Sequence, residues 1–238
     1  ELGYEGGIRA VICVPGGERI AAKTFNPQLG IEGGISILGT SGIVEPMSVQ
    51  ALIDTVTLSL RQAKAQGARR VVLTPGNYGE DFLRQFAPAS GVPVAKCSNF
   101  IGEALDEAAA LEFEDVLLVG HAGKLVKLAG GIMNTHSRWA DCRTELFCAH
   151  AAVCGAPREV CKELMHAATS DACLTILQQT GLREPVMKSL LDAIEVHLVR
   201  RAAGAYRVGA VLFTNEFGFL GQTESAARIL ADWRGQTT

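Results

Sequence analysis

Most residues with chemically useful side chains fall in short polar or glycine-rich clusters, each directly after a predicted strand. Carboxyl ends of parallel strands face one edge of a sheet, so such clusters converge on one crevice, the usual ligand site of open α/β sheets. Glycines let a ligand approach the backbone, and the helices that follow offer unpaired N–H groups. One such cluster is typical of a turn, but five together predict a ligand-binding edge. They occupy residues 39–42, 74–79, 97–99, 120–124 and 214–218.

The cluster at residues 74–79 holds more special residues than a turn needs. It follows a short apolar strand and contains a proline, two glycines, an asparagine and a tyrosine in the order TPGNYG. A structural turn explains such a loop taken alone. At the carboxyl end of a parallel strand, the same residues are typical of a loop that holds a ligand.

A further polar cluster lies at residues 130–141, away from any predicted strand end. A helix start capped by Ser137 accounts for part of it, but not for Asn134, His136 and Arg138 together. A structural role and a functional role both remain open for this stretch. His121 and His136 are the two histidines in predicted loops, which makes them the candidates for a general base.

Several sharper motifs are absent. Two residues separate Gly120 from Gly123, whereas a phosphate-binding P-loop has four residues between its glycines and a Ser or Thr after its lysine. Neither a Gly-x-Gly-x-x-Gly fingerprint nor the common methyltransferase glycine pattern follows a strand. Cysteines in the later, helical region are six or seven residues apart, which spreads them around a helix, so we predict core thiols and no metal site. These are Cys142, Cys148, Cys154 and Cys161.

Composition restricts the class of protein. The chain has 238 residues, 48% hydrophobic and 20% charged, with a net charge of −3 and a pI near 6.0. We expect enough core for a large α/β domain. We expect no nucleic-acid partner, since a basic excess is missing, and no membrane span, since no apolar run reaches about 18 residues. Seven scattered cysteines and the lack of a signal-peptide pattern indicate a cytoplasmic protein.

The elements that must position these clusters alternate between strand and helix. Strand–helix–strand alternation predicts an α/β fold, a mostly parallel, doubly wound sheet of about six strands in one domain over residues 1–238. Several strands are nearly continuous apolar runs, which is typical of strands covered on both faces. They are expected at residues 8–14, 35–38, 71–74, 92–96, 116–120 and 208–214.

Helical patterns fill the spaces between the strands. After residue 124 the alternation stops, and residues 125–204 predict a helical insertion before the last strand. Ser137 is expected to cap one of its helices, which Gly155 ends, and Pro157 is expected at the first position of the next. Other helices are expected between Ser48 and Gly67, at 102–111, at 184–203 and at 223–233.

Long stretches of the chain closely resemble one known family, the cobalt-precorrin-5B (C1)-methyltransferases of anaerobic cobalamin biosynthesis, of the CbiD type. The resemblance runs in order along nearly the whole chain. It rests on KTFNPQLGIEGGISILGTSGIVEPMS (23–48), TPGNYGE (74–80), KCSNFIGEALD (96–106), LLVGHAGKLVKLAGGIMNTHSRWADCR (117–143) and TNEFGFLGQT (214–223).

This resemblance implies an enzyme that transfers a methyl group from S-adenosylmethionine to ring carbon 1 of a cobalt-containing corrinoid. The cobalt then belongs to the substrate, and the protein needs no metal of its own. Members usually carry a further N-terminal segment with an Arg-x-Gly-Phe-Thr-Thr-Gly-Thr-Cys-like motif, which this sequence lacks. Because the chain starts at Glu1, we expect it to be the main C-terminal part of a longer protein. The sequence leaves open a homo-oligomer and the activity of this chain alone.

Loop position and side-chain type give hypothetical roles within that reaction. In-line methyl transfer depends mainly on holding the two reactants in place, and His121 or His136 could assist a proton transfer. The loop at 74–80 supplies an aromatic ring and an acid for the cofactor, and basic residues suit the carboxylates of the corrinoid. The expected cofactor residues are Thr74, Gly76, Asn77, Tyr78, Gly79, Glu80, Ser98 and Asn99. The expected corrinoid residues are Lys124, Lys127, Asn134, Ser137, Arg138 and Arg143.

Two other functions stay open at this point. The chain could be a domain that binds a nucleotide or a tetrapyrrole without catalysis. It could also be a nucleotide-dependent oxidoreductase or another transferase on the same sheet, although the missing dinucleotide fingerprint argues against that class.

Overall fold

A computed structural model describes residues 6–7, 9, 11–24, 33–35, 49–76, 79, 81–83 and 91–235. The chain divides into two compact units, Glu1–Pro46 and Met47–Thr238. Described residues of the first unit include one short helix, α1 (Gly17–Ala21). Residues 11–14 have no regular structure, so the strand expected at 8–14 is wrong there. The strand expected at 35–38 lies outside the described residues except for Ile35, which has no regular structure.

The second unit is built on a five-stranded, mostly parallel sheet in the order β2-β1-β3-β4-β5. β1, β2, β3 and β4 are parallel, and β5 pairs antiparallel with β4. The α/β class and the mostly parallel sheet are therefore confirmed, whereas six strands are not. The strands are β1 (Arg70–Thr74), β2 (Val94–Lys96), β3 (Asp115–His121), β4 (Arg207–Thr214) and β5 (Gly218–Gln222).

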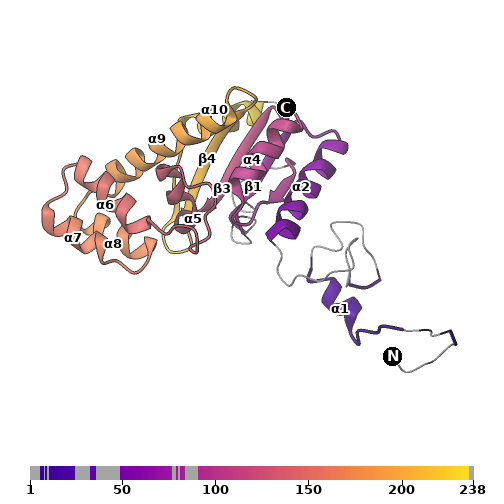
Figure 1. The fold of residues 1–238 in the computed structure, drawn as a ribbon. Coiled ribbons are helices and arrows are strands. Elements are labelled where there is room, and N and C mark those ends of the chain that lie inside the picture. The colour runs from indigo at the N-terminus through magenta and orange to yellow at the C-terminus, as the bar shows by residue number, and fades with distance from the viewer. Residues whose placement is uncertain are drawn as a thin grey trace. The chain divides into compact units, whose positions relative to one another are not determined.

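Apolar side chains cover both faces of the central strands, which explains their continuous apolar sequences. Residues such as Leu73 and Leu118 join the larger core, and their strand neighbours Val72 and Leu117 join a smaller one on the other face. In Figure 1, α2 (Val49–Ala65), α4 (Ile101–Ala110) and α9 (Arg183–Ala202) lie beside the sheet. These helices supply the larger core, while α10 (Glu224–Gly235) supplies the smaller one. The doubly wound arrangement stays a prediction, because residues 84–90 between β1 and β2 lie outside the described part.

The segment between β3 and β4 is mainly helical. Its helices are α5 (Ala122–Leu125), the 3₁₀ helix η3 (Val126–Gly130), α6 (Arg143–Val153), α7 (Arg158–Met165), α8 (Ser170–Gln179) and α9. In Figure 1, α6, α7 and α8 form a group at the end of this unit away from α2. Buried Phe147, Leu164 and Leu174, one from each of these helices, join the larger core. The group is thus packed onto the same core as the sheet.

Two helices begin at other residues than the sequence predicts, and one strand was not predicted. Ser137 lies in a turn and caps no helix, because α6 begins six residues later, after Cys142 in a left-handed conformation (φ 50°). Pro157 is the residue before α7 rather than its first residue. β5 was not expected. Its sequence, GFLGQ, contains two glycines with positive φ, Gly218 and Gly221, which weakens a strand pattern.

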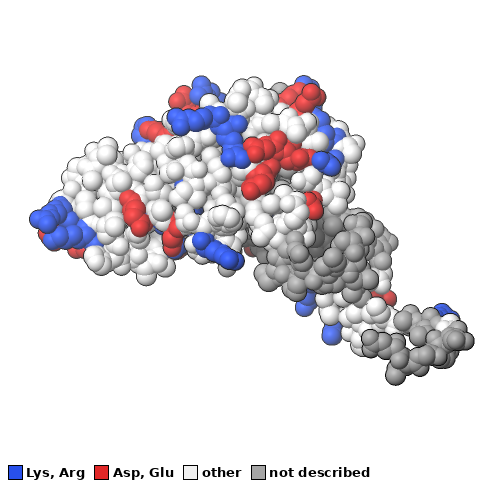
Figure 2. Space-filling model, in the orientation of Figure 1, with Lys and Arg blue, Asp and Glu red and all other residues white. Residues whose placement is uncertain are grey.

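Charges of both signs alternate on the outer face of the helices. Arg201 forms an ion pair with Asp106, and Arg61 forms one with Glu107. Figure 2 shows blue and red side chains next to one another over this face. Such exposed pairs contribute little to stability.

Candidate functional site

The sheet order places a cavity between the ends of β1 and β3. After β1 the chain forms β2 on one side of β1, and then β3 on the other side, so the order reverses between β1 and β3. Ligands of open α/β sheets bind at such a reversal, at the carboxyl ends of the strands. A cavity of about 430 Å³ lies there. Its walls are Pro75, Gly76, Gly79, Asp81, Gly120, His121 and Lys124.

Two glycines let the two loops meet. A Cβ on Gly120 would lie 2.7 Å from Pro75 Cγ, so a larger residue at the end of β3 would push the β1 loop away. A Cβ on Gly79 would lie 2.8 Å from Thr74 Cβ. Gly76 has φ +154°, a conformation that other residues rarely adopt. The glycines at 76 and 79 that the sequence analysis singled out are therefore required by the shape of this cavity.

Lys124 joins the two loops through a hydrogen bond. Its ammonium group donates to the Pro75 carbonyl oxygen at 2.6 Å. Partial burial lowers the pKa of Lys124, and the nearby Cys97 opposes this shift. Lys124 therefore lies with the loop that was expected to hold the cofactor, although the sequence analysis assigned it to the corrinoid.

His121 is the last residue of β3, and its side chain caps the short helix α5. Its Nδ1 accepts a 3.0 Å hydrogen bond from the Gly123 N–H, so the neutral ring carries its proton on Nε2. Burial lowers the pKa of His121, and the Asp171 carboxylate opposes this shift. The neutral ring is thus the favoured form, and Nε2–H offers a donor rather than a base.

Two clusters far apart in the sequence meet beside the end of β2. The Thr135 N–H donates to the Asn99 carbonyl oxygen at 3.0 Å, and Phe100 and Asn134 form an isolated antiparallel bridge. Ser98, next to Asn99, has a positive φ of 52°, which is uncommon for a serine. The loop expected to hold the cofactor and the loop expected to hold the corrinoid are therefore in direct contact.

Lys127 holds the second of these loops from inside. Its side chain is only 3% exposed, and its ammonium group donates to the carbonyl oxygens of Thr135 (3.0 Å) and Ala140 (2.9 Å). Asp141 lies 3.8 Å away. Burial lowers the pKa of Lys127, and Asp141 opposes this shift. This ammonium group is engaged with the protein's own backbone, which fits a structural role better than contact with a ligand.

The rest of that loop is exposed and locally hydrogen-bonded. Asn134 Oδ1 accepts from the His136 N–H at 3.1 Å, and His136 Nδ1 accepts from the Arg138 N–H at 3.1 Å. His136, Ser137 and Arg138 are exposed. Arg143 Nη2 donates to Asp141 Oδ2 at 2.8 Å, and this hydrogen bond lowers the pKa of Asp141. Side chains of this turn are therefore presented to solvent on a fixed backbone.

Three sequence-predicted residues, Asn77, Tyr78 and Glu80, lie outside the described residues, and their roles stay predictions. Thr74 is fully buried, and its Oγ1 has no hydrogen-bond partner among the described residues.

Part of this edge was not expected from the sequence. Pro75 and Asp81 line the cavity, and Ser170 and Asp171 start α8 next to it. Ser170 Oγ lies 3.8 Å from where a Gly123 Cβ would be, and it has no hydrogen-bond partner among the described residues. Thr169, whose side chain caps α8 through the Ala172 N–H at 3.1 Å, is the signal that could have located this helix start.

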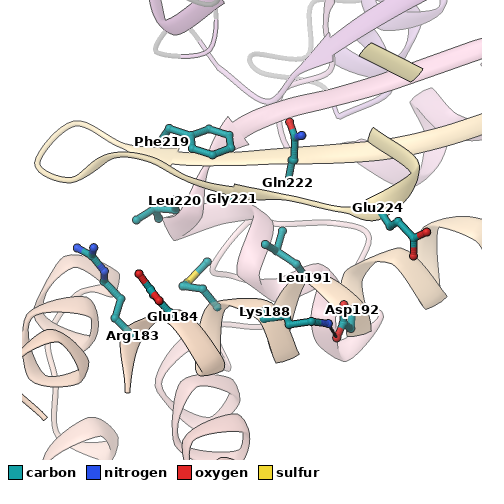
Figure 3. Close-up of a pocket in the computed structure, with 11 residues that line it drawn as sticks. Arg183, Glu184, Lys188, Leu191, Asp192, Phe219, Leu220, Gly221, Gln222 and Glu224 are labelled. Atoms are coloured by element: carbon teal, nitrogen blue, oxygen red, sulfur yellow. Dashed lines mark hydrogen bonds and ion pairs between the residues drawn. The ribbon is translucent and has the colours of Figure 1, made fainter. Parts of the chain in front are cut away.

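A second, larger cavity of about 550 Å³ lies between α9 and β5 (Figure 3). Met187, Leu191 and Leu220 form its apolar wall, and Lys188 Nζ pairs with Asp192 Oδ2 at 2.7 Å on its rim. None of the expected site residues that the structure describes lines it. Its charged residues have both signs: Arg183 and Lys188 against Glu184, Asp192 and Glu224. Such a lining does not favour a ligand with several carboxylates.

The described residues contain no group of three or more His, Cys, Asp or Glu side chains that could hold a metal ion. None of their helices combines the length and apolar character that a membrane crossing requires.

Comparison with known families gives two matches. A family model described as CbiD matches residues 1–46, and one described as CbiD, C-terminal domain, matches residues 134–224. The second match includes the loop that Lys127 holds, together with α6 to α9, β4 and β5. No solved structure matches the chain.

Curated relatives cover most of the chain. The cobalt-precorrin-5B C(1)-methyltransferase of Ruminiclostridium cellulolyticum is 51% identical over 214 residues, which are 90% of this chain and 56% of the relative. Its namesake from Alkaliphilus metalliredigens is 42% identical over 229 residues, 96% of this chain and 60% of the relative. That from Methanocaldococcus jannaschii is 38% identical over 197 residues, 83% of this chain and 54% of the relative. The chain spans between 54% and 60% of these three relatives and belongs to the CbiD family.

Proposed function

We propose that this chain carries out methyl transfer from S-adenosylmethionine to carbon 1 of cobalt-precorrin-5B, within a longer protein. The observation that carries the proposal is the 51% identity, over 90% of the chain, to a relative named for that reaction. A cavity at the order reversal of the sheet, where ligands of open α/β sheets bind, supports the proposal.

The cavity between β1 and β3 fits a methyl donor of this kind. S-Adenosylmethionine supplies the methyl group from its sulfonium. Glycine walls at Gly76, Gly79 and Gly120 let a ligand approach the backbone. The ammonium group of Lys124 lies in the wall, where it can face an anionic group. We assign the loop at 74–80, with Ser98 and Asn99, to the cofactor.

We assign the turn at 134–138, with Arg143, to the corrinoid. The contact between Asn99 and Thr135 makes this turn a direct neighbour of the cofactor residues, as transfer between two bound molecules requires. Arg138 is exposed and can meet a carboxylate of the corrinoid edge. In this proposal Lys127 positions the turn instead of binding the corrinoid.

Catalysis then comes mainly from positioning. Nδ1 of His121 and of His136 each accepts a backbone N–H, so each neutral ring presents Nε2–H as a donor. A ring that carries its proton on Nε2 can take a second proton only at Nδ1, where the hydrogen bond from the backbone N–H would be lost. We therefore propose that both histidines orient or hydrogen-bond a ligand, while the backbone of the two loops holds donor and acceptor in line.

Binding measurements test the proposal before any activity assay. Calorimetry of the whole chain with S-adenosylhomocysteine, NAD and ATP should give heat with the first ligand alone. Heat with NAD or ATP instead would favour the nucleotide-binding alternatives. No heat with S-adenosylhomocysteine from folded protein would overturn the cofactor site, and labelled-methyl transfer to cobalt-precorrin-5B then separates an enzyme from a binding domain.

Two variants separate the two sides of the site. Tyr78→Ala should weaken S-adenosylhomocysteine binding and leave corrinoid binding unchanged, and His136→Ala should do the reverse. If Tyr78→Ala left cofactor affinity at the wild-type value, the assignment of the 74–80 loop would be wrong.

A further inference from the structure

Lys124 is a partly buried cation that has no anionic partner among the described residues. Its ammonium group makes one hydrogen bond, to the Pro75 carbonyl oxygen, and an ammonium has three donors. No carboxylate of the described residues forms an ion pair with Lys124. The neighbouring Lys127 differs, because its ammonium group lies 3.8 Å from Asp141 and donates to two backbone carbonyl oxygens. A charge taken out of water without a partner is unfavourable. The ammonium group of Lys124 can therefore take an anionic group of a ligand as its partner.

The thiol nearest to Lys124 does not supply that charge. Complete burial raises the pKa of Cys97 to about 12, so this side chain is a neutral thiol at neutral pH. Burial also lowers the pKa of Lys124. A bound anion would reverse this effect, since an opposite charge nearby favours the charged form of a lysine.

A carboxylate is the anion that both proposed ligands carry, and the cavity favours one of them. Among the described residues that line this cavity, Lys124 and Asp81 have side chains of opposite charge. Such a pair suits a zwitterion with a carboxylate and an ammonium group, as in an α-amino acid. The carboxylates of a corrinoid edge come without an ammonium group. In addition, Lys124 is bonded to Pro75 in the loop assigned to the cofactor.

We propose that the cavity between β1 and β3 binds the α-amino acid end of the methyl donor, with its carboxylate on the Lys124 ammonium group. This inference rests on the proposed function and assigns one end of the cofactor. The amino acid end then lies between the β1 and β3 loops and the short helix α5. Lys124 acts as a binding residue and takes no part in the transfer itself.

Two ligands that differ at this end test the inference. S-Adenosylhomocysteine carries the amino acid end, and 5′-methylthioadenosine is the same thioether nucleoside without it. Calorimetry of the whole chain, without corrinoid, should show tighter binding of S-adenosylhomocysteine. Lys124→Gln should weaken that ligand about tenfold or more, the loss expected for a charge-assisted hydrogen bond, and should leave 5′-methylthioadenosine unchanged.

Two further variants control for charge and folding. Lys124→Arg keeps the cation and should retain most of the preference for S-adenosylhomocysteine. Lys64→Gln is the matched control, because Lys64 also donates to a backbone carbonyl, that of Glu112 at 2.7 Å, but on α2 outside the cavity. It should change neither affinity. Melting curves of each variant show that the compared proteins are folded.

The outcomes separate the inference from the proposed function. If wild-type protein bound neither ligand, the cofactor site itself would fail. Equal binding of both ligands by the wild type would leave that site standing and overturn the role of Lys124. The role would also fail if Lys124→Gln weakened both ligands by one factor, or if it left the affinity for S-adenosylhomocysteine at the wild-type value.

Discussion

The Thr135 N–H donates a 3.0 Å hydrogen bond to the Asn99 carbonyl oxygen. This bond ties the loop after β2 to the turn that follows η3, although 36 positions separate the two residues. The Gly102 N–H strengthens the same connection through the Met133 carbonyl oxygen at 3.2 Å. The proposed cofactor and corrinoid residues thus share one backbone framework, so a change that loosens the turn should affect both ligands.

Lys127 is the residue whose loss should loosen that turn most. Lys127→Met keeps the length of the side chain but leaves the Thr135 and Ala140 carbonyl oxygens without their donor. Buried groups left unsatisfied cost about 1–3 kcal/mol each, and removal of a buried charge offsets part of this. We expect a loss of about 2–3 kcal/mol in the free energy of unfolding, measured by urea denaturation.

The matched control is Lys64→Met, because the Lys64 ammonium group donates to a carbonyl oxygen at the exposed surface. Water replaces that donor, so the free energy of unfolding should change by less than about 0.5 kcal/mol. Equal effects of the two substitutions would show that Lys127 does not hold the turn.

Gly120 should prove necessary for the shape of the cavity. In Gly120→Ala, the new methyl group would lie 2.7 Å from Pro75 Cγ and 3.1 Å from Leu125 Cδ1, so the β1 loop must move. Overpacking of this kind costs about 1–3 kcal/mol of stability. We also expect weaker S-adenosylhomocysteine binding by calorimetry.

Gly130→Ala is the control for that experiment. Its added methyl group would lie 3.2 Å from the end of the flexible Leu146 side chain and 3.9 Å from the Ile132 side chain. Both are distances that a small side-chain movement can accommodate. Affinity for S-adenosylhomocysteine should stay at the wild-type value. Should Gly120→Ala bind the ligand as tightly as Gly130→Ala does, the β1–β3 cavity would not be the cofactor site.

The central strands and the helix after Ser48 in the second unit were predictable, because their buried positions are apolar and recur with the period of the element. Val71 to Leu73 and Val116 to Val119 are continuous apolar runs because both faces of those strands are covered. The helix ended by Gly67 was found for a similar reason: Val56, Leu60 and Ala63 repeat at helical spacing and are buried.

Elements defined by tertiary contacts could not be predicted in the same way. β5 exists because it pairs with β4, and its glycines hide any strand pattern; a Cβ on Gly221 would lie 2.7 Å from Leu191 Cδ1. Apolar residues at 11–14 suggested a strand, but the described residues there have no strand partner. Local sequence carries no information on whether a partner strand is available.

The sequence predicted which edge of the sheet holds the candidate site, but it did not predict the side-chain contacts there. Strand ends located the loops at 74–79 and 120–124, which do form a cavity. Tertiary packing decides the other contacts. The Lys127 side chain points inward, and Ser170 lies beside Gly123, because of the way η3 and α8 pack on the sheet. Lysine in a polar cluster is equally compatible with a solvent-facing and a buried side chain.

Asp115 should matter for stability and not for ligand binding. It is 2% exposed at the start of β3, at the end of the strand opposite to the candidate site. Arg207 donates to both of its carboxylate oxygens, at 2.7 and 3.0 Å, and Trp233 Nε1 donates at 2.8 Å. Asp115→Asn should lower the free energy of unfolding by about 2–4 kcal/mol, measured by urea denaturation.

Asp192→Asn provides the comparison, because it breaks an exposed i,i+4 pair with Lys188 that contributes little to stability. Both variants should bind S-adenosylhomocysteine with wild-type affinity at temperatures where they are folded. A stability loss for Asp115→Asn no larger than that for Asp192→Asn would mean that the Asp115 network is not structural.

His121 should make the folded state sensitive to acid. Its pKa is lowered in the folded chain, chiefly by burial, whereas the unfolded value is about 6.5. Below that pH the unfolded chain binds a proton that the folded chain binds less readily, so stability falls as the pH drops from about 6.5 towards the lowered value. His121→Asn keeps a side-chain oxygen that can cap α5 and removes the titration. The difference between urea midpoints at pH 7.5 and 5.5 should therefore be smaller in the variant than in the wild type.

Part of the acid sensitivity should remain in that variant. Burial also lowers the pKa of His150, whose Nδ1 lies 2.8 Å from Ser189 Oγ, so His150 contributes with the same sign. The double variant His121→Asn/His150→Gln should show a smaller difference between the two pH values than either single variant. An unchanged difference in His121→Asn would show that the ring at the end of β3 takes up its proton as readily in the folded chain as in the unfolded one.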